Sequence, residues 1–519
     1  HEISLGEENA TYVIKPSVRP SDASNKNVFY TSSDDSVATV SANGTVTAVG
    51  NGVAVITVTT EDGGFSETLL VNVQMRIHPE SVRFSMYSHS FSRKGEKIKV
   101  QVTVYPENAY DKSYTLTSAD ESVATVSQDG TITAVGYGYT SIYVKTNDGG
   151  IADTFFVIFN APKGDTEPDP GESPVVRKEK LKGVWVGTVS NLDFPSRQGL
   201  SADKLKEELD AIVTTCKDAG LNAIFFQVRP TSDAFYKSSI FPSSTYLTGK
   251  QGSEIQLDCL EYLIQKAHAA NIEVHAWINP YRIAFGHDLT ALSEDNPARK
   301  NPEWVVFFKD KSGNKSMWYD PGIPAVRQLI TDGVMEIVNN YSVDGIHFDD
   351  YFYPYDTNAA GFSDDISFAL YNPANMSRAD WRRNNNDSLI LSIHNAIEKS
   401  GRKVAFGVAP FGVWAKKSSN SLGTDIPNSN ESYYAIYADT RKWVLSGWLD
   451  YICPQVYWET THTTAPFCPV VDWWNELVST TKVELYIGMQ MDSTQNKSKQ
   501  PYKTYEELKL QADYISSKS

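Results

Sequence analysis

Cysteine is scarce in this chain of 519 residues, which has four of them, no Cys-x-x-C pair and no histidine nearby at metal-binding spacing. That pattern excludes a disulfide scaffold and a zinc ribbon. We therefore expect buried free thiols at Cys216, Cys259, Cys453 and Cys468. Long hydrophobic runs are missing too. No apolar stretch approaches the roughly 18 residues that a membrane helix needs, so we expect no membrane-spanning segment.

Clusters of positive charge are also absent. The chain carries 47 Lys and Arg residues against 63 Asp and Glu, a net charge of −16. Because nucleic-acid binding needs clustered cations, we expect no nucleic-acid partner. The chain opens at His1 without a charged and then apolar leader, so we expect that any export signal has been removed or left out. Its length predicts about three to five domains, or one large domain with appendages.

The first 160 residues contain a duplicated segment. SVATVSANGTVTAVG at 36–50 and SVATVSQDGTITAVG at 122–136 are identical at 12 of 15 positions, with an offset of 86. Alternating Val, Thr and Ile runs separated by Asn-Gly, Asp-Gly and Gly-Gly turns predict two all-β sandwiches, over 1–75 and 76–160. The pattern resembles the bacterial Ig-like group 2 domain, which implies an exported or cell-surface protein. Neither copy has a tryptophan or a polar cluster, so we expect both to act as spacers.

A linker and a different kind of domain follow. Pro, Gly and acidic residues at 161–176 predict an extended linker. Over 177–519, apolar runs of strand length alternate with helical stretches, which predicts a parallel sheet covered by helices. The Gly-rich first turn of a doubly wound sheet is missing, so we expect an α/β TIM barrel of the (β/α)8 type. The expected strands are 181–190, 223–230, 272–280, 344–351, 404–414, 451–458 and 483–492. The expected helices are 201–219, 257–270, 323–341, 379–400, 438–446, 469–478 and 505–515. An eighth strand is lacking, and we favour truncation of the chain over an open barrel.

The alternation of side chains along the strands predicts a site at the mouth of the barrel. Alternate residues face the axis, and chemistry sits at the carboxyl ends of the strands. In DGIHFDD, this rule turns His347 and Asp349 inward. Aromatic faces beside carboxylates and amides suit sugar rings, which stack on the former and hydrogen-bond to the latter. The other inward positions are Gln227, Arg229, His275, Trp277, Asn279, Ala405, Gly407, Ala409, Gln455, Tyr457, Glu459, Gln490 and Asp492.

Two carboxylates could divide the work of glycoside hydrolysis, one ionised and one protonated. We assign the ionised role to Asp349, whose pKa a neighbouring Arg or His could lower, and the protonated role to Glu459, beside a Tyr-Trp pair. Asp492 is the reserve, and Asp350, of opposite parity, could orient Asp349 or a nearby loop. An acid on the sixth strand opposite an ionised Asp on the fourth favours retention of anomeric configuration. The expected substrate-binding residues are Arg229, Asp233, Trp277, Asn279, Tyr281, Arg282, His347, Tyr351, Gln455, Tyr457, Trp458 and Gln490.

Structural alternatives exist for several of these residues. Arg229 and Asp233 could form a clamp between loops, and His275 and His347 could be hydrogen-bonded core histidines. A metal site would need three or four ligands to converge, and the His-x-His strand of barrel metallohydrolases is missing. We therefore expect neither a metal nor another cofactor.

Five ordered motifs point to a family. LKGVWV, QVRPTSDAFYKS, AWINPYR, DGIHFDDYFYP and ICPQVYW resemble the glycosyl hydrolase-like 10 family of bacterial envelope proteins. The resemblance implies a TIM-barrel hydrolase acting on glycans, with bacterial cell-wall (peptidoglycan) strands as the substrate class. It also implies a periplasmic, outer-membrane-attached or extracellular location, with attachment through the N-terminal region. The motif residues it carries over are Arg229, Asp233, Asn279, Arg282, His347, Asp349, Asp350, Gln455 and Tyr457.

Two further readings of the barrel stay open. The spacing of Asp344, His347 and Asp349 resembles chitinase-like enzymes, in which the N-acetyl group of the substrate is the nucleophile. The acid of those enzymes would fall at Tyr351, so we rank this mechanism second. The other reading is a non-catalytic carbohydrate-binding or adhesin-like surface protein, and several carboxylates at the mouth favour an enzyme over it.

Overall fold

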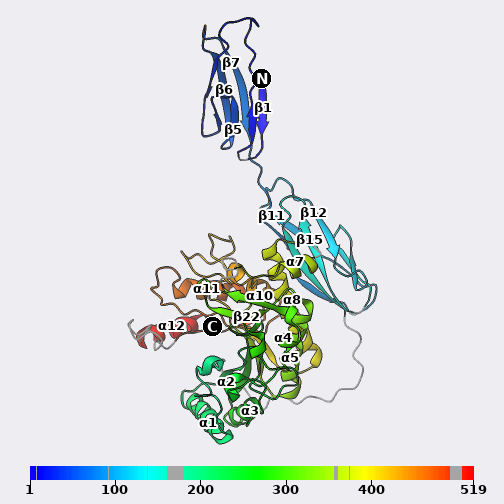
Figure 1. The fold of residues 1–519 in the computed structure, drawn as a ribbon, viewed down its shortest axis with the longest axis vertical. Helices are drawn as coiled ribbons and strands as arrows, with labels where there is room; N and C mark the ends of the chain where they lie inside the picture. Colours follow the sequence, from blue (N-terminus) through cyan, green and yellow to red (C-terminus); the bar gives the residue numbers. More distant parts are fainter. Residues whose placement is uncertain are drawn as a thin grey trace.

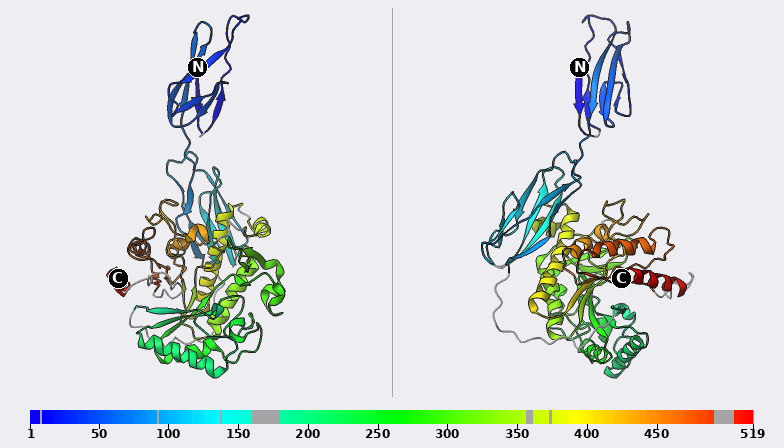
Figure 2. Two further views of the ribbon diagram at one scale, coloured as in Figure 1. Left: turned by 60° about the vertical axis from the view of Figure 1, so that its left-hand side comes forward. Right: turned by 180° about the vertical axis from the view of Figure 1, so that it is seen from behind.

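The chain folds as two β sandwiches followed by a larger α/β domain (Figure 1). The computed structural model describes residues 1–7, 9–91, 93–136, 138–159, 180–355, 361–372, 375–490 and 505–518. The sandwiches follow one another along the long axis, and the second lies against the α/β domain (Figure 2). None of the helices in the described ranges is long and apolar enough to cross a membrane.

Each sandwich packs small sheets around an apolar core, as the repeat predicts. The first has sheets β1 (Glu2–Leu5), β7 (Ser66–Val73), β6 (Gly52–Thr60), β3 (Val28–Ser32) and β2 (Thr11–Val13), β5 (Thr45–Ala48), β4 (Ala38–Val40). The second has a four-stranded sheet in the order β12 (Tyr114–Ser118), β15 (Gly138–Thr146), β16 (Ala152–Phe159) and β9 (Ser88–Phe91). It also has a three-stranded sheet of β10 (Lys97–Lys99), β14 (Thr131–Ala134) and β13 (Ala124–Val126), and a pair formed by β11 (Val102–Tyr105) and β8 (Ser81–Phe84). The all-β interpretation is confirmed.

The α/β domain is built on one parallel sheet of seven strands in sequence order. They are β17 (Gly183–Val186), β18 (Ala223–Arg229), β19 (Glu273–Ile278), β23 (Gly345–Phe348), β24 (Ala405–Val408), β25 (Tyr451–Ile452) and β26 (Glu484–Leu485). The main helices are α1 (Ala202–Asp218), α3 (Cys259–Ala269), α5 (Pro324–Asn340), α8 (Arg378–Ser400), α10 (Thr440–Leu445), α11 (Phe467–Val478) and α12 (Tyr505–Ser517). Every expected strand and helix is present, with shorter strands than the apolar runs suggest.

Local sequence signals explain where these helices begin and end. Ser201, Asp258 and Ser377 each accept a backbone N–H at the start of α1, α3 and α8, as N-cap residues do. Gly401 ends α8 in the left-handed conformation, at a φ of 70°. The amphipathic α1 buries Leu205, and its polar face is exposed.

Two glycines on the inner face of the sheet leave room for aromatic rings inside its curl. A Cβ on Gly345 would lie 2.2 Å from the ring of His275, and one on Gly407 would lie 2.1 Å from the ring of Tyr451. Glycine at both positions therefore makes room for large rings on the axis. The two edges of the sheet approach each other, because a Cβ on Gly488 would lie 2.8 Å from Trp185. The described strands thus form a curled parallel sheet consistent with a TIM-type fold.

One element was not expected from the periodicity. Between β19 and α5, the chain forms an antiparallel sheet of β20 (Arg282–Phe285), β22 (Lys315–Tyr319) and β21 (Val305–Lys309). Short helices complete the loops: η1 (Val189–Asn191), α2 (Thr245–Thr248), η2 (Leu289–Ala291), α4 (Pro297–Lys300), η3 (Pro302–Trp304), α7 (Asp365–Leu370) and α9 (Ser432–Ala435). This insertion begins directly after the end of β19 and so borders the mouth of the sheet.

Candidate active site

Two carboxylates follow one another at the carboxyl end of the central strand. β23 ends at Phe348, and both Asp349 and Asp350 are buried, with exposed fractions of 4% and 5%. Because the strand ends before them, the alternation of faces no longer applies to Asp350. Both carboxylates therefore reach the mouth, whereas the alternation rule had turned only Asp349 toward it.

Three N–H groups hold the Asp349 carboxylate. Its Oδ2 accepts hydrogen bonds from Trp277 Nε1 at 3.0 Å and from Asn279 Nδ2 at 2.6 Å. Its Oδ1 accepts from the backbone N–H of Tyr351 at 3.2 Å. All three groups can only donate, so each one favours the ionised form of the carboxyl.

A relay of amides fixes the orientation of Asn279. Gln227 Oε1 accepts from the backbone N–H groups of Thr188 at 2.8 Å and Val189 at 3.0 Å. The other end of the Gln227 amide therefore donates, from Nε2 to Asn279 Oδ1 at 2.6 Å. This leaves the Asn279 amino group to donate to Asp349. The first two strands thus position the central carboxylate through buried side chains.

A tyrosine and an arginine complete the surroundings of the pair. Tyr355 donates from its hydroxyl to Asp350 Oδ2 at 2.7 Å and stacks on Tyr351, with ring centroids 5.2 Å apart. The Arg282 guanidinium lies 4.6 Å from the Tyr351 ring centroid and donates from Nε and Nη2 to the Pro230 carbonyl. Its positive charge lies close enough to oppose protonation of both carboxylates.

The electrostatics of the pair place both titrations near neutral pH. Burial and the adjacent Asp350 raise the pKa of Asp349 to about 7, while Arg282 opposes the shift. Burial raises the pKa of Asp350 to about 6, against the hydrogen bond from Tyr355. Such coupled groups titrate as a unit, so the pair holds about one proton between the two steps.

Asp350 borders an open pocket of about 510 Å³. Aromatic rings and amides dominate its walls, and one edge comes from a loop after β24. Burial, with the charge of Asp350, raises the pKa of Tyr457. The lining residues are Asp350, Phe411, Gly412, Asn428, Ser429, Asn430, Gln455, Tyr457, Trp458, Thr464 and Gln490.

A directional chain of hydrogen bonds fills the axis beneath the site. Trp185 Nε1 donates to His347 Nε2 at 3.1 Å, so His347 Nδ1 carries the proton and donates to the Tyr451 hydroxyl at 3.0 Å. Tyr451 then donates to His275 Nδ1 at 3.0 Å, and His275 Nε2 donates to Glu273 at 3.2 Å. Burial and His275 lower the pKa of His347 well below its usual range. Both histidines therefore lie in the interior, and His347 is fully buried there.

Besides His347, three of the expected substrate-binding residues are placed outside the mouth. A register shift between Gln227 and Arg229 breaks the alternation on β18, and Arg229 stacks on Phe241 at 3.8 Å. Asp233 is buried and accepts from Thr231, Gln251 and the backbone of Thr245. Tyr281 is completely buried in the main apolar cluster. The inward placement of Arg229 was wrong, because the bulge reverses its face.

Glu459 and Asp492 are not joined to the pair. Glu459 is half-buried at the start of the loop before α11, and its backbone carbonyl accepts from His462 and Phe467. It is not among the described residues that line the pocket. Asp492 lies outside the described residues. In the part of the chain that the structure describes, no three His, Cys, Asp or Glu residues are grouped to hold a metal ion.

Sequence reasoning missed one partner of the carboxylate pair and part of the pocket. Tyr355 follows the carboxylates in the run DYFYPY, where several aromatic residues made a single partner impossible to choose. Asn428, Ser429 and Asn430 come from a polar loop that has no periodic signal. Phe411 lay in an expected strand, but β24 ends at Val408.

Comparisons with known proteins identify the families to which the two parts of the chain are similar. The model of the family described as glycosyl hydrolase-like 10 matches residues 180–505, and that of the bacterial Ig-like domain (group 2) matches 6–71 and 81–155. The chain belongs to the glycosyl hydrolase-like 10 family. Both resemblances inferred from the sequence motifs are thereby confirmed.

Relatives of this family member include two named proteins. It is 40% identical over 330 residues to glycosyl hydrolase YngK of Bacillus subtilis (strain 168), covering 63% of this chain and 64% of YngK. It is 34% identical over 374 residues to glycosyl hydrolase DigH of Escherichia coli (strain K12), covering 68% of this chain and 81% of DigH. The chain thus spans slightly less than two thirds of YngK.

Similarity to solved structures is weaker. A cycloisomaltooligosaccharide glucanotransferase from Paenibacillus aligns with 84% of this chain and 51% of its own, at 11% identity and a TM-score of 0.37. The surface-layer protein SbsC, domains 1–6, aligns with 27% of this chain and 20% of its own, at 23% identity and a TM-score of 0.18. At these scores, neither likeness bears on function.

Proposed function

We propose that this protein is a glycoside hydrolase whose reacting groups are the neighbouring carboxyls Asp349 and Asp350. The observation that carries the proposal is the coupling of the two groups, with pKa values raised to about 7 and about 6, where one of them, Asp350, lines a pocket of aromatic rings and amides. Glycosidases need one ionised and one protonated carboxyl at the same pH. Membership of a glycosyl hydrolase-like family supports the same conclusion.

Access to the pocket distinguishes the catalytic roles of the two carboxyls. Asp350 lines the pocket, so it can give its proton to the leaving oxygen of a bound glycan. The raised pKa values belong to the coupled pair, so the hydrogen-bond partners decide which carboxyl holds the shared proton. Asp349 faces three groups that can only donate, whereas Asp350 faces the Tyr355 hydroxyl, which can also accept, so we assign the charge to Asp349 and the proton to Asp350. This arrangement keeps Asp349 in the ionised role expected from the sequence and moves the acid role from Glu459 to Asp350.

The adjacency of the two residues favours one mechanism. Consecutive residues on one wall cannot flank a sugar ring on opposite faces, as an inverting pair must in order to leave room for water. The second-ranked mechanism of the sequence analysis fits this constraint, because there the substrate supplies the nucleophile. The proposed substrate is therefore a glycan of 2-acetamido sugars.

The reaction follows in two steps. The acetamide oxygen attacks the anomeric carbon and closes a five-membered ring while the bond to the leaving oxygen breaks. Asp350 donates its proton to that oxygen, and Asp349 accepts a hydrogen bond from the acetamide N–H, which keeps its proton. Water then gives a proton to Asp350 and adds to the anomeric carbon. The bond between that carbon and the acetamide oxygen breaks, so the five-membered ring opens and the acetamide is restored. Two displacements at one carbon give net retention of configuration, the outcome also favoured by the sequence analysis.

The proposed natural substrate is the glycan strand of the bacterial cell wall, whose sugars carry acetamido groups. Trp458, Tyr457 and Phe411 offer rings for stacking, and the nearby amides offer paired hydrogen bonds. A cell-wall substrate agrees with Ig-like domains and with the proposed exported location, in the periplasm, on the outer membrane or outside the cell.

The test is product release from purified, peptide-free wall glycan, compared with chitin oligomers and with polysaccharides that lack acetamido groups. We expect products from the first two substrates alone, and we expect their anomeric configuration to be retained. NMR of the newly released reducing end, recorded before its anomers equilibrate, measures that configuration. Inverted products, or equal turnover of glycans without acetamido groups, would contradict the mechanism and return the acid role to Glu459. Binding without turnover would support the carbohydrate-binding alternative.

A further inference from the structure

The two Ig-like copies differ on the outer face of one strand. At the offset of 86, Phe156 and Ile158 of β16 stand where β7 has Leu70 and Asn72. On β7, Leu70 is 36% exposed, whereas on β16 Phe156 and Ile158 are buried, with exposed fractions of 5% and 4%. All eight residues of β16 are buried. Since only one face of a sandwich strand faces its own core, something else covers the outer face.

The α/β domain covers that face. Phe156 and Ile158 belong to the main apolar cluster of the α/β domain, and Phe156 packs edge-on against Trp448, with ring centroids 5.3 Å apart. Trp448 Nε1 also donates to Ser88 Oγ at 3.3 Å. A neighbouring cluster joins Tyr143 of β15 to Trp381 of α8. In the first copy, the position of Tyr143 holds a threonine.

A buried ion pair crosses the same interface. Lys442 of α10 lies 3.4 Å from Asp153 of β16 and 3.2 Å from Asp387 of α8. Lys442 Nζ also donates to the Thr154 carbonyl at 3.3 Å. All three charged side chains are about 5% exposed. Removing one partner of such a pair leaves the others buried and uncompensated, which is strongly destabilising.

One route from this interface to the pocket runs through α10. Asp439 caps α10 and accepts from Trp414 Nε1 at 3.0 Å. Trp414 follows the pocket residues Phe411 and Gly412, and its carbonyl accepts the backbone N–H of Tyr433, just past the 428–430 loop. The ion pair is thus separated from the pocket wall by one short helix.

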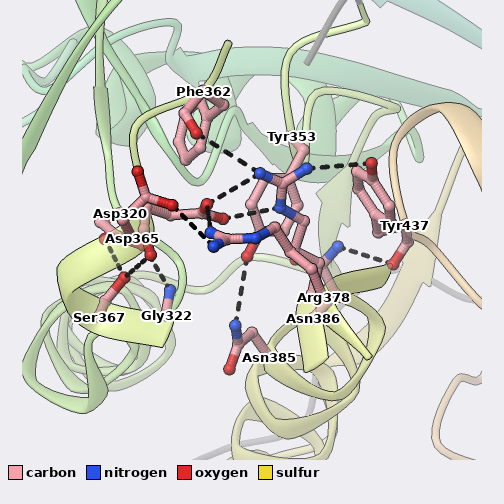
Figure 3. A network of polar contacts seen from close by, with 12 residues as sticks. Asp320, Gly322, Tyr353, Phe362, Asp365, Ser367, Arg378, Asn385, Asn386 and Tyr437 are labelled. Carbon is pink, nitrogen blue, oxygen red and sulfur yellow. Dashed lines mark hydrogen bonds and ion pairs between the residues drawn. The ribbon is translucent and has the colours of Figure 1, made fainter. Parts of the chain in front are cut away.

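A second route runs through α8 (Figure 3). Arg382 donates to Asp364 and to the Tyr437 hydroxyl, and Asn385 donates to the Tyr353 hydroxyl at 3.2 Å. Tyr353 lies between the carboxylate pair and Tyr355 in the chain. The helix that packs against Tyr143 on its outer side therefore holds the site loop on its inner side.

We infer that the second Ig-like domain is a structural part of the catalytic module, which positions the 411–437 wall of the pocket through Lys442, while the first copy is a spacer. This inference corrects the expectation that both copies are spacers. Its effect on turnover rests on the proposed function, whereas its effect on the folding of the α/β domain does not. Lys442 acts as a positioning residue, because it is linked to the pocket through the helices α10 and α8 and does not line the pocket itself.

The matched variants Phe156→Ala and Leu70→Ala of the full chain test the docking. All eleven tryptophans lie at or after Trp185, so tryptophan fluorescence reports on the α/β domain alone. We expect Phe156→Ala to lower the fluorescence-monitored midpoint by about 5 °C or more, because large buried side chains are costly to truncate. Leu70→Ala should leave it unchanged. Equal midpoints for the two variants would overturn the docking claim, whatever the activity.

Lys442→Met tests the positioning claim. We expect the KM for wall glycan to rise by about fivefold or more while kcat falls less, since a displaced wall weakens binding of the substrate. A merely stabilising role would lower the fraction of active enzyme, so kcat would fall with KM unchanged, and that result would overturn the claim. Should no glycan be turned over, the proposed function fails, and the fluorescence comparison still decides the docking.

Discussion

Replacing Asp349 by asparagine tests the site most directly. Trp277 and Asn279 both donate to Oδ2, so the amide oxygen of the new side chain must take that position. Its amino group then replaces Oδ1 and faces the backbone N–H of Tyr351, a donor against a donor. Such an unmet hydrogen bond costs about 1–3 kcal/mol. The variant also loses the negative charge needed opposite the developing positive centre.

The loss of that charge dominates the expected effect on rate. Removing a preorganised electrostatic group costs about 3–4 kcal/mol of transition-state stabilisation, so we expect kcat to fall by about 10²–10³-fold. Stacking on Trp458 does not depend on the charge, so glycan affinity should change far less.

Turnover is measured as reducing ends released from wall glycan, and binding by calorimetry on the same preparation. Asp233→Asn is the matched control, since it changes a buried carboxylate that contacts neighbouring loops, and kcat should stay within about threefold. If Asp349→Asn keeps more than about a tenth of wild-type turnover, a cost under ~1.4 kcal/mol, the assignment of Asp349 is refuted.

Three further outcomes are expected. A plot of kcat/KM against pH should be a narrow bell. The pair is doubly protonated below about pH 6 and loses its shared proton above about pH 7, so only the singly protonated pair is active. A flat profile from pH 5 to 8 would contradict the roles of Asp349 and Asp350. Trp185→Phe should lower the free energy of unfolding by about 1–3 kcal/mol in urea, since it leaves His347 Nε2 without a donor, and equal stability would argue against the axial chain. Deleting residues 1–160 should destabilise the α/β domain in thermal unfolding, whereas deleting only the first Ig-like copy should not; equal unfolding midpoints of the α/β domain in the two truncated chains would restore both copies as spacers.

Much of the fold could be predicted because its signals are strong and local. Buried parallel strands produce continuous apolar runs, and amphipathic helices such as α1 place a cap residue before a periodic face. The β20–β22 insertion escaped prediction, since its strands are short and half-exposed and lie within a segment that otherwise reads as a loop. β21 buries Val306 and Phe308 on one face, but a run of five residues is too short for its alternation to stand out in the sequence.

The site was predictable only as far as the strands are regular. Alternation placed Trp277, Asn279 and Asp349 on one face, and hydrogen bonds join them. It failed at Arg229, where a register shift turns the side chain outward, and it could not place Asp350, which lies past the end of its strand. Bulges and strand ends depend on tertiary contacts that one sequence does not display.

The duplication offers a signal of a different kind, because each copy serves as a reference for the other. Both copies keep apolar residues at the inward positions of β7 and β16, so the fold explains those positions and they carry no information about docking. Outward positions are free to differ, and there the second copy has Tyr143 for a threonine and Ile158 for an asparagine. A solvent-facing strand gains nothing from such apolar side chains and risks aggregation. Their presence in one copy alone therefore indicates a covered face, which is where the structure seats the α/β domain.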